Sequence, residues 1–290
     1  MKEKTGIEGL VKEAKNEVKT WDGFVEEAKS IWTRYLDDEA RDSVREWLDD
    51  KIGLPTSFNP KYDLESTKDG EYVLVKLPDE SPYDPREDST LGIIYSAIRS
   101  YNPDGHKVDE LEELYRLKLR NSQEDIGILE SNRNIISYPV YAYIHSGIAL
   151  SLGQFSDPWD SGLFGFYIVD KAKIREEWGK KRITKDVRKR IDECVESEIQ
   201  QLDDYYNGNV YGVCVLERDG DSWKYLDDDE VCWGFFGEDE AKVEGAGRVK
   251  CHEDQLKEKE ARHCGRGVAQ KYGKKGKQSD IQMQTRCQGG

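Results

Sequence analysis

The sequence predicts an α+β protein with a mainly helical N-terminal part, a small mixed or antiparallel sheet covered by one long helix, and a disordered C-terminal tail. Two patterns carry this prediction. Apolar residues recur at helical spacing through much of the first 120 residues, whereas β-branched and aromatic runs bounded by Gly, Pro or Asp fill residues 135–240. Seven Trp, sixteen Tyr and seven Phe supply the apolar bulk for a core, although 36% of the residues are charged.

Residues 1–120 are expected to form a mainly helical region. Apolar stripes predict amphipathic helices over 7–18, 24–36 and 40–48. A strand over 72–77 follows, and the three prolines of residues 78–88 exclude a regular element there. Two more helices complete the region, one burying Leu91, Ile94, Tyr95 and Ile98 and the other carrying the stripe from Val108 to Leu119.

The polar stretch 121–134 is predicted to be a linker to a core domain over residues 135–240. Because the fourth strand of this domain leads through the turn Asp219-Gly220 into another short strand, that end of the sheet should be antiparallel. The expected strands are 135–144, 148–152, 163–169, 210–217, 222–226 and 230–236, and the expected helices are 171–178 and 184–206.

Residues 241–290 are predicted to be a flexible basic tail with one helix near 253–262. The tail contains 12 Lys+Arg and 6 Asp+Glu, a net charge of +6, so residues 1–240 have a net charge of -21. A body this acidic repels nucleic-acid phosphate, so direct nucleic-acid binding by the body is not expected. A host protein with a basic surface is the expected partner.

The chain has no stretch of about 20 apolar residues and no signal-peptide core after Met1, so a cytoplasmic protein without a membrane span is expected. Its six cysteines are spread over the C-terminal third, which is typical of free thiols rather than a disulfide framework. No cofactor is predicted.

The most unusual polar chemistry lies in two neighbouring segments, Tyr143–Gly147 and Phe155–Gly162. The first is a strand end and the second a loop between turn residues, where functional groups often gather. His145 is a candidate base or metal ligand, which an aspartate could orient, and a serine is a candidate nucleophile. The candidate catalytic residues are His145, Ser146, Asp157, Asp160 and Ser161, and the candidate binding residues are Trp159, Asp160 and Ser161.

A structural interpretation of the same loop stays open. Asp160 and Ser161 would then hydrogen-bond their own turn, Trp159 would fill the core, and a backbone carbonyl would satisfy His145. Cys232 is a further candidate nucleophile with His145 as its base, although an apolar strand usually buries a cysteine as a small hydrophobe.

Two pairs in the tail, Cys251-His252 and His263-Cys264, have the composition of a four-ligand zinc site. Their spacing departs from that of ordinary zinc sites. On one continuous helix the pairs would be too far apart to share an ion, so no metal site is predicted.

Several of these motifs together resemble a family of uncharacterised proteins of bacteriophages and archaeal viruses, over about residues 138–237. The resemblance implies a virus- or provirus-encoded accessory protein that acts in the host cytoplasm, and it implies no catalytic residue. The motifs are His145-Ser146-Gly147, Pro158-Trp159-Asp160-Ser161-Gly162, Gly165–Val169, Asp204–Gly208, Val210-Tyr211-Gly212 and Cys232-Trp233-Gly234-Phe235.

Two functions follow as hypotheses. The first is an acidic protein-binding module, such as an inhibitor of host defence, whose surface occupies a basic partner. The alternative is a small hydrolase or metal- or ligand-binding enzyme that uses His145, Asp157, Asp160 and Ser161.

Overall fold

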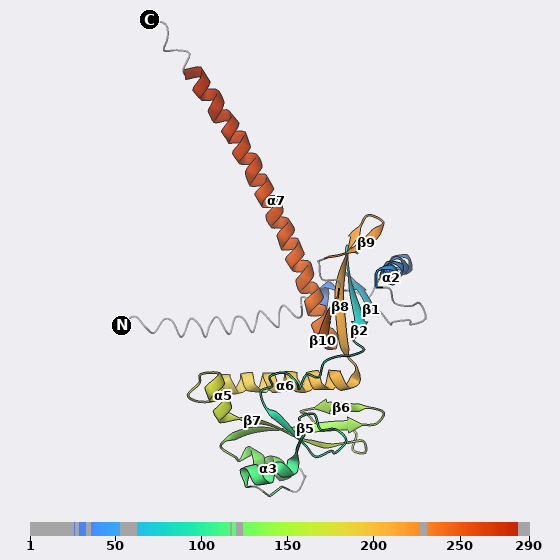
Figure 1. Cartoon of the computed structure of the whole chain (residues 1–290), viewed down its shortest axis with the longest axis vertical. Helices are drawn as coiled ribbons and strands as arrows, with labels where there is room; N and C mark the ends of the chain where they lie inside the picture. The colour runs from blue at the N-terminus through green and yellow to red at the C-terminus, as the bar shows by residue number, and fades with distance from the viewer. Residues whose placement is uncertain are drawn as a thin grey trace, which may run out of the picture.

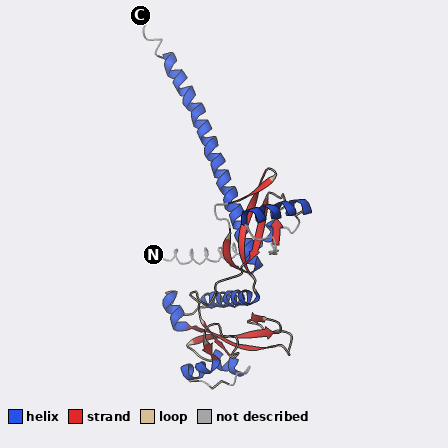
Figure 2. Cartoon of the chain, turned by 45° about the vertical axis from the view of Figure 1, so that its right-hand side comes forward, coloured by secondary structure: helices blue, strands red, loops and turns tan. Residues whose placement is uncertain are grey.

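The strands of the computed structural model form two five-stranded sheets, and each sheet is the centre of one lobe (Figures 1 and 2). The structure describes residues 26, 29–32, 36–52, 63–116, 118–119, 124–226 and 231–283, and it describes side chains no further than Arg262. Both the α+β class and the antiparallel pairing predicted from the sequence are confirmed.

The first lobe contains an antiparallel sheet in the order β1-β2-β8-β10, with β9 also paired to β8. Helix α2 (Asp38–Ile52) packs Val44 and Leu48 on one face, and α7 (Gly237–Met283) packs Ala241 and Ala246 on the other. The strands are β1 (Asp63–Ser66), β2 (Tyr72–Pro78), β8 (Val210–Asp219), β9 (Ser222–Tyr225) and β10 (Cys232–Phe236). Figure 1 shows α7 extending from this lobe as a single helix.

The second lobe contains a sheet in the order β4-β3-β7-β5-β6. Its strands are β3 (Ile93–Ser96), β4 (His106–Lys107), β5 (Ile135–Ile144), β6 (Ile148–Ser151) and β7 (Ser161–Asp170). Helices α3 (Val108–Tyr115) and α4 (Glu124–Glu130) pack on one face through Leu111 and Leu129. The long helix α6 (Lys185–Asn207) packs on the other face, next to the short helix α5 (Lys171–Glu177).

Helix α6 forms where the sequence predicts it because all its local signals agree. The hydroxyl of Thr184 caps the first turn by accepting a hydrogen bond from the amide of Val187, and Gly208 ends the helix in the left-handed conformation. Its apolar stripe faces the second sheet and is fully buried, so the sheet and helix share one core. The stripe consists of Ile191, Val195, Ile199 and Leu202.

The mainly helical N-terminal part is not confirmed, because four strands lie within residues 63–107. The helix expected to bury Leu91, Ile94, Tyr95 and Ile98 is wrong. Ile94 packs toward α6 and Tyr95 packs toward α3, which is the alternation of a strand, and pairing with β7 stabilises it. The expected helix over 40–48 is confirmed as α2, whereas the one over 7–18 lies outside the described residues.

The division into a helical region and a single-sheet core domain also differs from the structure. Strand β2 pairs with β8 over seven residues, so the early part of the chain shares a sheet with residues 210–219. Helices cover both faces of each sheet rather than one. These corrections share one reason, since strand pairing joins segments that are distant in sequence.

Two expected boundaries fall within helices of the structure. The expected linker 121–134 holds α4, because Leu129 is buried against the second sheet. The expected boundary at residue 241 falls inside α7, where Ala241, Ala246 and Val249 belong to the core of the first lobe. The helix expected near 253–262 is part of α7.

Two glycines of the sequence motifs are required by close packing. A Cβ atom on Gly165 would lie 2.1 Å from the carbonyl oxygen of Tyr95 on the neighbouring strand β3. A Cβ atom on Gly212 would lie 2.4 Å from the ring of Trp233. At both positions any larger side chain would force strands or rings apart, so these motif residues serve the framework.

The lobes meet where the C-terminal end of α6 approaches the start of α7. The amide of Gly237 donates to the carbonyl of Asn209 over 2.8 Å, and Asp204 is 93% buried at this contact. Burial raises the pKa of the Asp204 carboxyl, hydrogen bonds from Gln200 and Asn209 oppose this shift, and the negative charge of Asp239 adds to it. The contact therefore places an ionisable group where its charge is unfavourable.

We predict that Asp204→Asn makes the protein more stable than the wild type at neutral pH and that the gain shrinks toward pH 4. A carboxyl whose pKa is raised by folding favours the folded state when protonated, so its contribution falls as pH rises above the unfolded value of about 3.9. Urea unfolding of both proteins from pH 4 to pH 7 measures the difference. A difference that is constant over this range would contradict the assignment.

Candidate anion-binding site

The structure brings only part of the predicted polar loop together. The Nδ1 atom of His145 lies 3.4 Å from the Oδ2 atom of Asp160, and the two side chains are 71% and 41% exposed. Among the hydrogen bonds of the described residues, none joins His145 to Ser146 or Ser161. The pair therefore lacks the bonded nucleophile that acyl-transfer chemistry needs.

The other predicted loop residues serve their own turn or face solvent. Asp157 accepts hydrogen bonds from the amides of Trp159 and Asp160, and the hydroxyl of Ser161 donates to the Asp157 carbonyl. The carboxylate that caps this turn is thus Asp157, not Asp160. The expectation that Trp159 fills the core is wrong, because its side chain is 91% exposed beyond the end of β5 and the start of β7.

The remaining candidates are separated in space. Cys232 lies on β10 of the first sheet and His145 beside β5 of the second, and no hydrogen bond among the described residues joins this candidate nucleophile to its candidate base. The Cys251-His252 and His263-Cys264 pairs lie on the continuous helix α7, about 18 Å apart at 1.5 Å per residue. The Nε2 atom of His252 lies 3.6 Å from Glu217.

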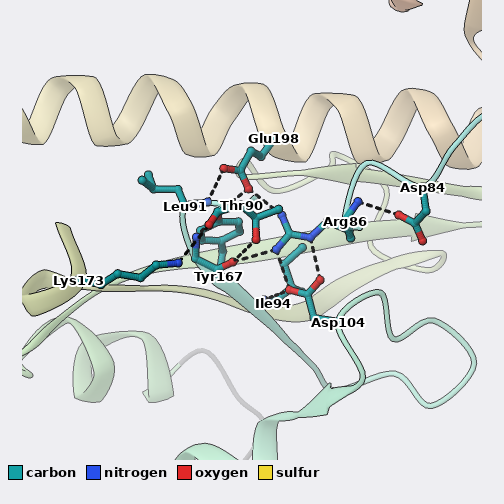
Figure 3. A network of polar contacts seen from close by, with 10 residues as sticks. Asp84, Arg86, Thr90, Leu91, Ile94, Asp104, Tyr167, Lys173 and Glu198 are labelled. Atoms are coloured by element: carbon teal, nitrogen blue, oxygen red, sulfur yellow. Dashed lines mark hydrogen bonds and ion pairs between the residues drawn. The ribbon is translucent and has the colours of Figure 1, made fainter. Parts of the chain in front are cut away.

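A buried polar network surrounds Arg86, whose side chain is 97% buried (Figure 3). Its guanidinium forms a two-pronged ion pair with Asp104 at 2.7 and 2.8 Å. A single contact of 2.7 Å joins it to Glu198. Glu198 also accepts the hydroxyl of Tyr167 and the amide of Leu91. The network therefore joins the loop before β3 to both α6 and β7.

This network is a structural one. Burial and then the Glu198 carboxylate raise the pKa of the Tyr167 hydroxyl, which stays protonated and donates to Glu198. The same hydroxyl accepts the amide of Gly92, and Asp104 accepts the amide of Ile94. Because the charged and backbone groups of this network bind one another, we interpret it as a structural network rather than a ligand site.

A second ionic cluster lies in the first lobe, where the carboxylates of Asp63, Glu65 and Glu238 are close enough together to hold a metal ion. The ammonium group of Lys76 already lies 2.7, 3.0 and 3.5 Å from these three side chains. Burial lowers the pKa of Lys76, but the bonds to Asp63 and Glu65 outweigh this and raise it, so the ammonium stays charged. Lys76 thus fills the position of a cation.

Basic residues gather in a cleft at the corner between α5 and α6, which lies at the left of the lower lobe in Figure 1. Here the chain forms an open cleft of about 570 Å³. Eight of the twelve lining residues are basic and one is acidic. We call this the basic cleft, and its lining consists of Arg133, Ile136, Lys171, Arg175, Lys181, Arg182, Ile183, Thr184, Lys185, Arg188, Lys189 and Asp192.

Six of these eight cations have no carboxylate partner within the part of the chain that the structure describes. They are Arg133, Lys171, Arg175, Lys181, Arg182 and Lys185. The only lining carboxylate, Asp192, accepts the Nε atom of Arg188 at 2.7 Å and the hydroxyl of Tyr138. The cleft therefore keeps a local excess of positive charge.

The pKa of Lys171 reflects this local excess of positive charge. Burial, and then the positive charges of Arg188 and Arg175, lower the pKa of its ammonium group. This direction is the opposite of that at Lys76, where carboxylates raise the pKa. A bound anion would relieve the repulsion among the cations of the cleft.

Local structure holds the cleft in shape. The guanidinium of Arg188 lies 5.2 Å from the ring centre of Tyr138, and that of Arg190 lies 4.8 Å from the ring centre of Trp178. The ammonium group of Lys171 donates to the carbonyl of Arg133. The N-terminus of the 23-residue helix α6 opens onto the same cleft, and its dipole adds partial positive charge.

The basic cleft was not predicted from the sequence, although the charge pattern of the chain contains a signal for it. Residues 171–190 contain ten Lys+Arg and three Asp+Glu, a net charge of +7. Averaging charge over the first 240 residues concealed this segment within a body of net charge -21. A count over 20-residue windows would have found it.

We predict that Arg86→Ala lowers the free energy of unfolding by about 3–5 kcal/mol, because it leaves Asp104 and Glu198 without the cation that compensates them. Urea unfolding at pH 7 measures this change. Arg99→Ala, at an exposed position after β3, is the matched control and should change stability by less than about 0.5 kcal/mol. Equal effects of the two substitutions would refute a structural role for the network.

Comparison with known proteins adds no assignment. No protein-family model, curated protein or solved structure matches the chain. Within the described residues, no helix combines the length and the apolar character that crossing a membrane requires. The site is therefore interpreted from its own geometry and charge.

Proposed function

We propose that the protein is a non-enzymatic binding protein that holds a phosphate-bearing anion in the basic cleft. The observation that carries the proposal is the set of eight basic side chains around one concavity, six of which form no ion pair among the described residues. Phosphate groups match this chemistry, because arginine binds phosphate oxygens in a two-pronged manner and lysine contributes a point charge.

The cations of the basic cleft repel one another, as the lowered pKa of Lys171 reflects. A multivalent anion replaces this repulsion with attraction, and each phosphate contact releases bound counterions. Affinity that falls steeply with salt is therefore a direct consequence of the proposal.

A second function rests on the rest of the surface. Outside residues 171–190, the first 240 residues have a net charge of -28. We propose that this surface binds a basic host protein, in keeping with the virus- or provirus-encoded accessory role that the resemblance implies. The acidic surface and the basic cleft serve different ligands, so the two functions are compatible.

For the cleft, we predict that the double substitution Lys181→Glu and Arg182→Glu weakens the binding of inorganic tripolyphosphate by at least about tenfold, which corresponds to 1.4 kcal/mol. Isothermal titration calorimetry at about 0.1 M salt measures the affinity. The variant should keep the wild-type circular dichroism spectrum, because both side chains are exposed.

The matched control is Lys68→Glu with Arg99→Glu, which changes the net charge equally at exposed positions away from the cleft. It should leave the affinity within about twofold of the wild type, since exposed charges beyond the Debye length of about 10 Å are screened. If both double variants weaken binding equally, the effect comes from net charge and the cleft is not the site.

For the acidic surface, we predict that immobilised protein retains a basic host protein at low salt and releases it as salt rises. Pull-down from host lysate through a salt series, followed by mass spectrometry, measures this. Retention should be unchanged in the Lys181→Glu and Arg182→Glu variant. Failure to retain any basic protein at low salt would count against this second function.

A further inference from the structure

We infer that the anion of the basic cleft is a compact nucleoside polyphosphate, of the nucleoside triphosphate class, rather than an extended polyanion. This inference rests on the proposed anion-binding function and specifies its ligand. Three features of the cleft support it: the concentration of positive charge there, the apolar side chains in its lining, and the Oδ2 atom of its one lining carboxylate.

Most of the positive charge of residues 171–190 gathers at the concavity. Seven of the ten basic residues in this segment line the cleft, and five of these seven form no ion pair among the described residues. Of the other three, Lys173 pairs with Glu177 at 3.7 Å, Arg190 stacks on Trp178, and Lys180 lies outside the lining of the cleft. A nucleic-acid strand that left the cleft would meet a body of net negative charge, whereas two or three linked phosphates fit within the cationic zone.

The size of the cleft fits a small ligand. Its volume of about 570 Å³ falls within the range of roughly 300–1,000 Å³ that is typical of small-molecule sites. Ile136 and Ile183 contribute apolar surface beside the cations. Inorganic phosphate gains nothing from such surface, whereas a nucleobase gains from burial against it and from stacking with a guanidinium group.

The carboxylate of Asp192 favours a ligand that carries a hydrogen-bond donor beside its phosphates. Both of its hydrogen bonds, from Arg188 and from Tyr138, use the Oδ1 atom. Among the described residues, no hydrogen bond or ion pair uses its Oδ2 atom. A carboxylate oxygen repels phosphate but accepts a hydrogen bond from a ribose hydroxyl or an exocyclic amino group, so it favours the nucleoside part of the ligand.

The test compares four probes on the full chain by isothermal titration calorimetry without divalent cations: ATP, inorganic tripolyphosphate, adenosine and a single-stranded 12-mer oligonucleotide. ATP should bind at least about tenfold more tightly than tripolyphosphate, although the two carry similar charge. Adenosine alone should bind at least about a hundredfold more weakly than ATP, because it has no phosphate. ATP should also displace any bound oligonucleotide.

One substitution separates the nucleoside contact from the phosphate contact. Asp192→Ala should reduce the preference for ATP over tripolyphosphate at least about threefold, while tripolyphosphate binds as tightly as before or more tightly because a negative charge has been removed. Asp192→Asn, which keeps a carbonyl acceptor, should retain more of the ATP preference. A merely structural role for Asp192 would instead weaken both ligands together and would overturn this assignment.

The outcomes distinguish the two levels of the proposal. If tripolyphosphate binds at the cleft as tightly as ATP or more tightly, the nucleoside inference is overturned and anion binding stands. If the oligonucleotide binds more tightly than ATP, the ligand is an extended polyanion and the inference is likewise overturned. If none of the phosphate-bearing probes binds, the proposed anion-binding function itself fails.

Discussion

The antiparallel pairing of β2 with β8 is the constraint on which the rest of the structure depends. Residues 72–78 align with residues 211–217, and the whole second lobe lies between these two neighbouring strands in the chain. The amide of Asp79 donates to the carbonyl of Val210 over 2.8 Å, so the two connections to the second lobe leave the first sheet side by side. Because α6 ends at Gly208, just before β8, its C-terminal end is held at the lobe junction. Its N-terminal end, and the basic cleft with it, then lies about 35 Å away along the 23-residue helix.

The protein itself shows how a structural cation differs from one available to a ligand. Arg86 and Lys76 are almost fully buried, and each contacts at least two carboxylates, so their charges are neutralised within the fold. The cations of the basic cleft are more exposed and outnumber the single carboxylate that lines it. Evolution of a soluble surface does not require like charges to gather in a concavity, since dispersed charges serve solubility with less repulsion. The contrast between the two kinds of site is the main reason for assigning a ligand to the cleft.

The sequence predicted best those elements whose formation depends on residues within the element itself. The elements from β5 to β10 were placed within about two residues, because alternation, helix caps and turn residues such as Asp219-Gly220 act within each element. The β3 segment was mistaken for a helix, because Ile94 and Tyr95 are adjacent apolar residues whose opposite faces become evident only when β7 pairs with them. The assignment of strands to two sheets depends on pairing over more than 130 residues, which no local pattern encodes. The candidate loop was chosen by residue type, and its polar groups proved to satisfy their own turn, whereas the basic cleft required a local count of charge.

The acidity of the chain does not argue against an anion site, because electrostatic repulsion is a local effect in salt. At physiological ionic strength the Debye length is about 8 Å, several times shorter than the roughly 35 Å from the lobe junction to the start of α6. Carboxylates of the first lobe are therefore screened at the cleft, and the potential that a ligand meets there is set mainly by the charged residues that line it, eight basic and one acidic. The distant negative charge acts instead on the part of a long polyanion that extends out of the cleft. The net negative charge of the body thus disfavours long polyanions, whereas the basic cleft attracts the phosphate groups of a short one.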